Sequence, residues 1–314
     1  MELVRGLHNL RPRHRGCVLT IGNYDGVHRG HQHMIGAVRS GAHEFGVPAT
    51  VLTFEPTPRE YFQGPRAPAR LTRLREKLEA LAGYGVDRTI VARFSEEMSR
   101  ASAAAFIGFL VDELGIRRLI VGDDFHFGRD REGSIATLRA AGRRDGFDVE
   151  QIASFELNGE RVSSSLVRAA LESGDLDRAT RLLGRPYRIL GRVQLGRRLG
   201  RTLGFPTANL ALHRKVIPLW GIFAVRVHGG GFADHPAVAS LGTRPTVDGI
   251  EPLLEVHAFD FAGDLYGKIL RVDFIARLRD ERRFATLDAL VEQMKIDAVE
   301  ARVALGLRAA GARQ

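Results

Sequence analysis

The hydrophobic periodicity of the chain changes at residues 184–187, Gly-Arg-Pro-Tyr, and this change constrains the fold more than any other feature. Before it, short β-branched runs alternate with stretches of helical spacing, which is typical of an α/β domain with a parallel sheet. After it, short extended runs are separated by glycine and proline, which favours an antiparallel barrel. We therefore expect two domains, 1–184 and 185–314.

The first half is expected to be a doubly wound α/β domain. Its predicted strands cover residues 18–21, 50–54, 89–91, 118–121 and 149–152. An amphipathic helix is expected over residues 72–81 with Thr72 as its N-cap, and two more helices over 164–171 and 176–183. With 314 residues, 44% of them hydrophobic, the chain is long enough for a second packed core as well.

The second half is expected to form the barrel from strands at residues 221–227, 237–241, 253–259 and 269–274. A long periodic run over residues 286–305 predicts a C-terminal helix that packs on this barrel. We expect its role to be structural.

Composition excludes several classes of protein. The longest apolar run, residues 103–111, is far shorter than the roughly 20 residues of a membrane span. The first ten residues lack the apolar core of a signal peptide, so a cytoplasmic protein is expected. Cys17 is the only cysteine, which excludes an internal disulfide, and its apolar neighbours predict a buried structural thiol.

The formal net charge of +9 favours polyanionic ligands. Nucleic acid is disfavoured, because the arginines are scattered along the chain. The densest group, Arg197, Arg198 and Arg201, stands in a glycine-rich loop rather than along a helix face.

A histidine-containing stretch, Thr-Ile-Gly-Asn-Tyr-Asp-Gly-Val-His-Arg-Gly-His at residues 20–31, follows the strand expected at 18–21 and opens a helix. A doubly wound sheet places its ligand crevice at such a position. His28 and His31 share the first helical turn, and Gly30 removes a side chain between them, so a phosphate group fits at this helix N-terminus. Fixed donors there would stabilise the charge of nucleotidyl transfer. The alternative is two exposed histidines at a helix start.

A second stretch, residues 161–168, opens another helix with Arg161, Ser163 and Ser164. Its hydroxyls, backbone N–H groups and guanidinium suit a phosphate-sized anion. Taken alone, it would be a serine-capped helix.

A glycine-punctuated basic loop leads into Phe-Pro-Thr-Ala-Asn at residues 205–209. Its glycines, which allow close approach to phosphate oxygens, are Gly191, Gly196, Gly200 and Gly204. Thr207 and Asn209 would point to one side of an extended segment and offer neutral oxygens to a Mg²⁺ ion that also binds ATP. P-loop chemistry is excluded because no GxxxxGK[ST] occurs. A simple Asx-type turn is the alternative.

The first half resembles the nucleotidylyltransferase superfamily, which is Rossmann-like, and in particular the N-terminal module of the bacterial bifunctional riboflavin kinase/FAD synthetases. The family motifs HxGH, TFEPxPxE, DFxFGxxxxG and ISSTxIR correspond to residues 22–31, 53–60, 124–133 and 162–168. The resemblance implies catalytic roles for His28, His31, Arg161 and Ser164, and nucleotide binding by Gly22, Asn23, Asp25, Gly30, Asp124, Ser163 and Arg168. The departures are Tyr24 for phenylalanine, His126 for arginine, Ser134 for aspartate and Ser165 for threonine.

The second half resembles the riboflavin kinase module of the same family. The corresponding segments are residues 196–209, 217–227, 242–246, 254–267 and 278–284, with Ser240 in place of a usual asparagine. The resemblance implies that Thr207 and Asn209 bind the metal, that Glu255 is the general base, and that Gly191, Gly196, Gly200, Gly204 and Pro206 bind the nucleotide. Glu255 alternates with Leu254 and Val256, so it should face away from them.

The family resemblance implies two consecutive reactions. The barrel would phosphorylate riboflavin to FMN with ATP and Mg²⁺, and the α/β module would transfer AMP from ATP to FMN, yielding FAD and pyrophosphate. Two alternatives stay open: a riboflavin kinase whose N-terminal module is an inactive scaffold, because of His126 and Ser134, and a flavin- or RNA-binding regulator. A homo-oligomer is also left open.

Overall fold

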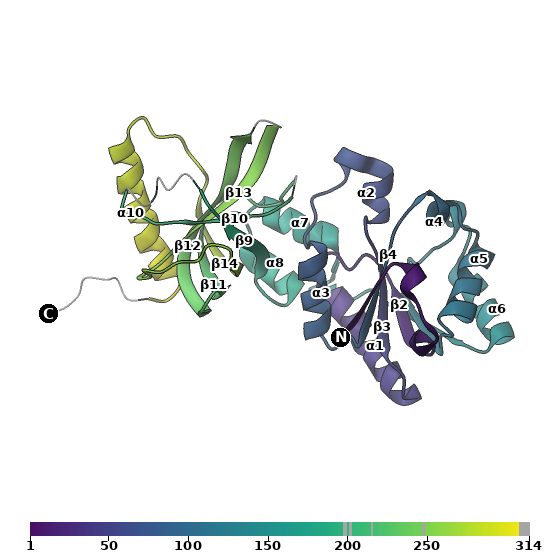
Figure 1. Cartoon of the computed structure of the whole chain (residues 1–314). Coiled ribbons are helices and arrows are strands. Elements are labelled where there is room, and N and C mark those ends of the chain that lie inside the picture. Colours follow the sequence, from purple (N-terminus) through teal and green to yellow (C-terminus); the bar gives the residue numbers. More distant parts are fainter. Residues whose placement is uncertain (197–199, 201–202, 215, 247–248, 308–314) are drawn as a thin grey trace. The chain divides into compact units, whose positions relative to one another are not determined.

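The computed structural model describes residues 1–196, 200, 203–214, 216–246 and 249–307. The chain divides into two compact units, Met1–Pro68 with Thr72–Ser164, and Ala69–Leu71 with Ser165–Gln314. Each unit contains its own sheet (Figure 1). Arg197, Arg198 and Arg201 lie outside the described residues. Among the helices that are described, none has the length and apolar character needed to cross a membrane.

A six-stranded parallel sheet forms the centre of the first unit, in the order β1-β4-β3-β2-β5-β6. Its strands are β1 (Glu2–Arg5), β2 (Val18–Ile21), β3 (Ala49–Phe54), β4 (Arg88–Ala92), β5 (Arg118–Gly122) and β6 (Asp148–Ile152). The five expected strands are confirmed. Strand β1 was not expected, because it is a short edge strand with charged residues at both ends.

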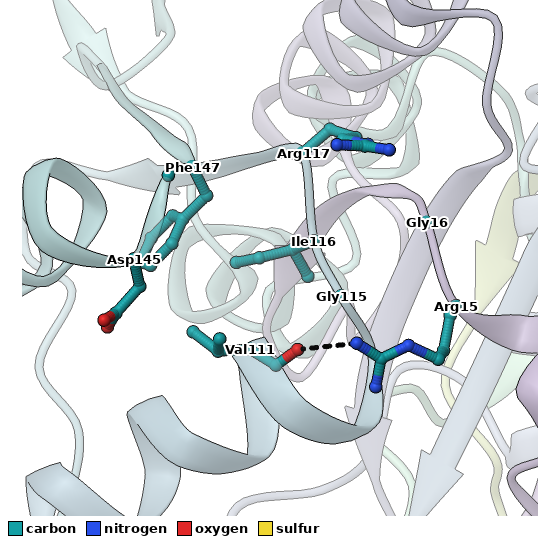
Figure 2. A pocket seen from close by; sticks show the side chains of 9 residues that line it. Arg15, Gly16, Val111, Gly115, Ile116, Arg117, Asp145 and Phe147 are labelled. Atoms are coloured by element: carbon teal, nitrogen blue, oxygen red, sulfur yellow. Dashed lines mark hydrogen bonds between the residues drawn. The ribbon is translucent and has the colours of Figure 1, made fainter.

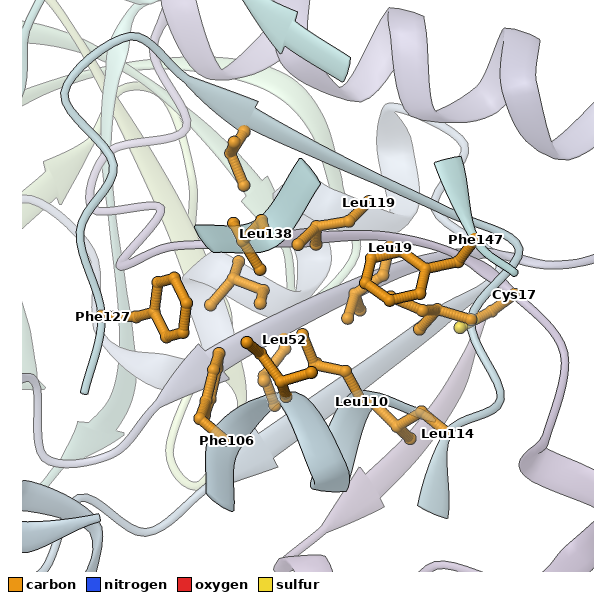
Figure 3. Packing of buried hydrophobic residues seen from close by; sticks show 14 of the residues in the cluster. Cys17, Leu19, Leu52, Phe106, Leu110, Leu114, Leu119, Phe127, Leu138 and Phe147 are labelled. Carbon is orange, nitrogen blue, oxygen red and sulfur yellow. The ribbon is translucent and has the colours of Figure 1, made fainter. Parts of the chain in front are cut away.

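Helices cover both faces of this sheet, as a doubly wound fold requires. The helices of this unit are α1 (Arg29–Phe45), α2 (Pro58–Gln63), α3 (Leu74–Gly83), α4 (Glu96–Arg100), α5 (Ala103–Gly108) and α6 (Ile135–Asp145). Val18 of β2 packs against Val38 of α1, whereas the next residue, Leu19, belongs to the cluster that contains Phe106 of α5 and Leu138 of α6 (Figure 3). The alternation of strand side chains therefore divides the core into two layers.

Cys17 lies in the second of these clusters and is fully buried (Figure 3). Burial raises the pKa of its thiol to about 11. The thiolate is therefore scarce near neutral pH, and the expected inert structural role is confirmed.

The prediction that Thr72 caps a helix is wrong. Helix α3 begins at Leu74, and Thr72 is used elsewhere. Its backbone N and Oγ1 donate to Oδ1 of Asp25 at 2.9 and 3.2 Å, and its Oγ1 accepts from the backbone N of Gly26 at 2.9 Å. Thr72 thus ties the start of α3 to the loop after β2, a long-range contact that helical periodicity does not reveal.

The second unit is built on a closed barrel in the order β10-β13-β12-β11-β14-β9, with antiparallel neighbours. Its strands are β9 (Tyr187–Gln194), β10 (Ala208–Ala211), β11 (Gly221–Gly229), β12 (Phe232–Thr246), β13 (Gly249–Ala258) and β14 (Ile269–Arg279). The barrel prediction is confirmed. Phe223 and Phe274 are fully buried and meet edge to face at 5.2 Å, as expected for the barrel interior.

The C-terminal helix is confirmed as α10 (Leu287–Ala304), capped by the hydroxyl of Thr286, which accepts from the backbone N of Ala289. Its Ala301 packs with Ile222 and Ala224 of β11. Since Phe223, between these two, points into the barrel, α10 covers the outside of the barrel wall.

Two helices precede the barrel, α7 (Ser164–Glu172) and α8 (Leu176–Leu183), and both were expected. Gly184 ends α8 with a φ of 70°, the left-handed conformation that favours glycine. Apart from Ser164, both helices belong to the second compact unit. The domain border at Gly184 stays a prediction.

A cavity of about 350 Å³ opens at the amino-terminal edge of the parallel sheet (Figure 2). Its lining includes Gly16 before β2, Arg117 before β5 and Phe147 before β6. Parallel sheets bind ligands at their carboxyl edge instead. No residue of the sequence motifs lines this cavity, so we assign it no part in the chemistry.

Candidate active sites

The histidine motif lies where β2 ends and α1 begins. Strand β2 has β3 on one side and β5 on the other, so the strand order reverses here and leaves a crevice at the carboxyl ends. His28 is the N-cap of α1, and its Nδ1 accepts a hydrogen bond from the backbone N of His31 at 3.4 Å. Because Nδ1 acts as the acceptor, the proton of a neutral His28 ring is on Nε2.

The two histidine rings are stacked, with centroids 3.7 Å apart, and Tyr24 lies 4.8 Å from His31. The Nδ1 atom of His31 is buried and has no hydrogen-bond partner among the described residues. Burial, followed by the charges of His28 and Lys77, holds the pKa of His31 well below its usual value. His31 is therefore a neutral imidazole, and its unpaired nitrogen favours a ligand with polar groups.

The second motif converges on the first. The hydroxyl of Ser164, at the start of α7, donates to the backbone O of Asp25 at 2.9 Å. A Cβ added at Gly30 would lie 3.2 Å from the His28 ring and 3.3 Å from the backbone O of Val162. A larger residue would crowd both segments, so glycine permits this close approach.

Other predicted residues have partners of their own. Arg161, on β8 (Glu160–Arg161), is exposed and donates to Asp124 at 2.8 Å, with Asp123 3.6 Å away. A hydrogen bond from Ser154, and to a lesser extent the charge of Arg161, lowers the pKa of Asp123. To bind a phosphate group, Arg161 must therefore release its ion pair with Asp124.

The remaining predicted residues of this motif set differ in their surroundings. Gly22, Asn23 and Ser163 are half-buried, and Gly22 and Asn23 lie directly after β2. The carboxylate of Asp25 is buried and bound by Thr72. Arg168 belongs to the second compact unit, where its Nε donates to the backbone O of Ala69 at 2.5 Å.

Three of the residues that depart from the family pattern, Tyr24, Ser134 and His126, make local contacts of their own. The extra hydroxyl of Tyr24 is satisfied by Thr20 Oγ1 at 2.7 Å. Ser134 caps α6, as an aspartate would, by accepting from the backbone N of Thr137. The guanidinium of Arg131 lies 3.2 Å from His126, so an arginine is still present at this turn. His126 and Ser134 both make local contacts, so neither departure by itself indicates an inactive scaffold.

Sequence reasoning missed Lys77 of α3. Its side chain is fully buried, and its Nζ donates to Thr53 Oγ1 at 3.4 Å. The burial of Lys77 could have been predicted from the sequence. Lys77 stands three residues after Leu74 and four before Leu81, on the helix face that the leucine spacing predicts to be buried.

The second site is a row of side chains across three neighbouring strands. Asn209 of β10 pairs with Glu255 of β13, and Glu255 pairs with Ser240 of β12. Directly paired residues project from the same face of a sheet. Leu254 and Val256 are buried, while Glu255 is half-buried and lines a cavity of about 260 Å³. The expected orientation of Glu255 is confirmed.

Helix α10 forms another wall of this cavity through Leu290, Met294 and Asp297. The expectation of a purely structural role is therefore incomplete. Asp297 is buried and accepts from Arg279 of β14 at 2.6 and 2.7 Å and from Gln293 at 2.8 Å. This ion pair joins the helix to the barrel beside the cavity.

Thr207 and Asn209 offer the neutral oxygens that suit Mg²⁺. A Cβ added at Gly196 would come within 2.5 Å of the Asn209 amide, and one at Gly200 would press on Thr207 Oγ1 and the backbone O of Phe205. Glycine therefore keeps the space beside both side chains open. In the part of the chain that the structure describes, no group of three or more His, Cys, Asp or Glu could hold a metal.

The glycines of the predicted loop are not equivalent. Gly204 has a φ of 83° and so requires glycine. The prediction that Gly191 belongs to the loop is wrong, because it lies within β9, where an added Cβ would meet the Leu210 side chain at 2.7 Å. Strand β9 was not predicted, because its polar residues and Gly191 interrupt the apolar pattern that is typical of a buried strand.

Two further contacts were not foreseen. His257 faces the same side of β13 as Glu255, and its Nδ1 donates to the backbone O of Pro206 at 2.9 Å, which holds the segment that carries Thr207. Ser240, the departure from asparagine, donates to Glu281 at 3.2 Å. Both residues line the cavity with Glu255.

Comparison with known proteins finds relatives of both halves of the chain. A family model described as FAD synthetase matches residues 10–166, and one described as riboflavin kinase matches residues 183–305. The chain is 53% identical to a bifunctional riboflavin kinase/FMN adenylyltransferase of Pseudomonas fluorescens, over 96% of this chain and 97% of the relative. It is 48% identical to the Escherichia coli K12 protein of the same description, over 98% and 99% of the two chains.

A solved structure from Streptococcus pneumoniae, described as a macrolide-efflux protein, has the same fold with a TM-score of 0.82 and 28% identity, over 95% of this chain and 97% of that one. The near-complete coverage by relatives described as bifunctional and the two matching family models lead to one assignment. The chain belongs to the bifunctional riboflavin kinase/FMN adenylyltransferase family.

Proposed function

We propose that the barrel unit phosphorylates riboflavin to FMN with ATP and Mg²⁺, and that the α/β unit adenylylates FMN with a second ATP. FAD and pyrophosphate are the final products. The observation that carries the kinase assignment is the row of Asn209, Glu255 and Ser240, of which Glu255 and Ser240 line one cavity. The histidine pair at the end of β2 carries the adenylyltransferase assignment.

In the kinase reaction, the terminal hydroxyl of riboflavin attacks the γ-phosphorus of ATP. An O–P bond forms, the bond between the β- and γ-phosphates breaks, and ADP leaves. Glu255 orients the hydroxyl and accepts its proton as the bond forms. Thr207 and Asn209 would hold Mg²⁺, whose charge stabilises the phosphate oxygens. Gly196, Gly200 and Gly204 allow the loop backbone to approach the nucleotide.

In the adenylyl transfer, a phosphate oxygen of FMN attacks the α-phosphorus of ATP. A new P–O–P linkage forms, the bond between the α- and β-phosphates breaks, and pyrophosphate leaves. The phosphate monoester is already ionised near neutral pH, so it needs no carboxylate base. His28, His31 and the N-terminus of α1 donate to the developing charge, with Arg161, Ser163 and Ser164 at the other motif.

Gly22, Asn23, Asp25 and Asp124 are proposed to line the nucleotide pocket, Asp25 through its backbone because Thr72 holds its carboxylate. Arg168 is proposed to contribute when the nucleotide is bound. We place the functional domains at residues 1–184 and 185–314 and the enzyme in the cytoplasm, where ATP and flavins are the small-molecule partners.

The decisive experiment incubates the purified chain with riboflavin, ATP and Mg²⁺ and separates riboflavin, FMN and FAD by chromatography. We expect FMN to rise first and FAD to follow. Chelation with EDTA should stop both steps. Absence of FMN would contradict the kinase proposal. Formation of FMN without FAD would support the alternative that the N-terminal module is an inactive scaffold.

A further inference from the structure

A fully buried lysine beneath the histidine motif has no part in the reactions proposed above. The Lys77 side chain is 1% exposed and lies on α3 beside Leu81, which is also fully buried. Transfer of an ammonium group from water to a protein interior is costly, so lysine is almost never buried unless specific contacts hold it. The position therefore calls for a reason other than packing.

The side chain of Lys77 is linked by hydrogen bonds to the loop that carries the motif. Its Nζ donates to Thr53 Oγ1 at 3.4 Å, and this buried hydroxyl donates in turn to the backbone O of Asn23 at 3.3 Å. An ammonium group can only donate, and a hydroxyl has one proton, so the chain of hydrogen bonds has one direction. It ends on the turn between β2 and His28.

Lys77 also acts on His31 through its charge. The titratable groups that face His31 are His28, stacked on its ring, Tyr24 at 4.8 Å, and Lys77. The phenol of Tyr24 is buried, with its pKa raised, so it adds no charge near neutral pH. The charge of Lys77 contributes to the low pKa of His31, after burial and His28.

We propose that Lys77 is a positioning residue of adenylyl transfer: through Thr53 its buried ammonium holds the turn before His28, and its charge adds to the electrostatic environment of His31. Lys77 would thus act through the turn and through His31, and not by contact with the phosphate. This inference rests on the proposed role of His31 in that reaction.

The test compares Lys77→Met, which keeps the length of the side chain but removes its charge, with Leu81→Met on the same helix, which changes packing only. Steady-state kinetics of FMN-to-FAD and riboflavin-to-FMN conversion are measured on each preparation. The Lys77→Met variant should lose about 10- to 100-fold in kcat for FAD formation, the range found for partners that orient a reacting group. FMN formation and the Leu81→Met variant should change little.

The second readout is the titration of His31, followed by NMR with labelled histidine and assigned with His31→Gln. Removal of a nearby positive charge should move this titration to higher pH. A lysine whose charge does not reach His31 would not produce that shift. Unchanged FAD formation in a folded Lys77→Met variant, or slower FAD formation without the shift, overturns the inference.

If Lys77→Met fails to fold, Thr53→Val provides the test. It removes the hydroxyl that links Lys77 to the backbone of Asn23, with little change in the shape of the side chain. Slower FAD formation with normal FMN formation supports the inference, and unchanged FAD formation overturns it. His31→Ala separates this question from the site assignment. If that variant keeps its adenylyl transfer, the proposed role of His31 fails, whatever Lys77 does.

Discussion

The two active sites differ in the groups they bring to a phosphorus atom. The site at the end of β2 presents nitrogen donors, namely His28, His31 and the N-terminus of α1. The site on the barrel presents oxygen side chains, Thr207, Asn209 and Glu255. The nucleophiles explain this difference. The phosphate of FMN is already ionised, whereas the riboflavin hydroxyl must lose a proton. The protonation state of the nucleophile thus dictates whether a carboxylate is required.

The substitution Glu255→Gln should separate the sites most clearly. FMN formation should fall about 10³-fold, because an amide cannot accept the proton of the hydroxyl. Conversion of added FMN to FAD should continue and serves as the internal control. Product chromatography measures both rates, and retained FMN formation would contradict the role of Glu255.

The substitution His31→Ala should produce the opposite result. FAD formation should fall about 10²-fold, as for loss of one donor to a charged transition state, while FMN formation persists. The same chromatography with FMN or riboflavin as substrate measures the two rates. Equal losses of both activities would show that the two sites are not independent.

The substitution Asp297→Asn tests whether α10 is part of the kinase site. Loss of the charge partner of Arg279 should cost about 3 kcal/mol in the free energy of unfolding, because one charge of a buried pair is left uncompensated. The KM for riboflavin should also rise, since α10 lines the cavity. Urea unfolding followed by the fluorescence of Trp220, the only tryptophan, reports on the barrel unit.

Glu300→Gln on the same helix provides the matched control, because Glu300 is exposed. It should unfold like the unchanged chain and keep its KM. An Asp297→Asn variant with unaltered stability and KM would mean that the ion pair is not needed to hold the helix.

The smallest expected effect concerns pH. The pKa of His31 is lower in the folded chain than in the unfolded one, so the unfolded chain takes up the proton first as the pH falls below about 6.5. The contribution to stability is complete above that pH and declines below it. The loss should be about 1 kcal/mol between about pH 7.5 and about pH 5.5. Urea unfolding by circular dichroism should show it in the unchanged chain, and a smaller loss in His31→Gln.

Local patterns predicted most of the fold. Four strands of the parallel sheet, β2, β3, β4 and β5, were found because each contains a buried apolar run, whereas β6 is more polar and more exposed. Strand β1 and strand β9 were missed because the first is short and charged and the second contains Gly191 and alternates polar residues. In both cases pairing with a neighbouring strand, rather than intrinsic propensity, stabilises the strand.

The sequence by itself determined the family and its two reactions, because the motifs that identify them are continuous along the chain. His28 and His31 share one helical turn, and Glu255 alternates with apolar residues. Only the tertiary structure decided which distant groups meet: Glu255 with Asn209 through strand register, and Lys77 with Thr53 through packing of α3. Strand register and the burial of Lys77 depend on contacts between residues far apart in the sequence. No local hydrophobic periodicity encodes such contacts.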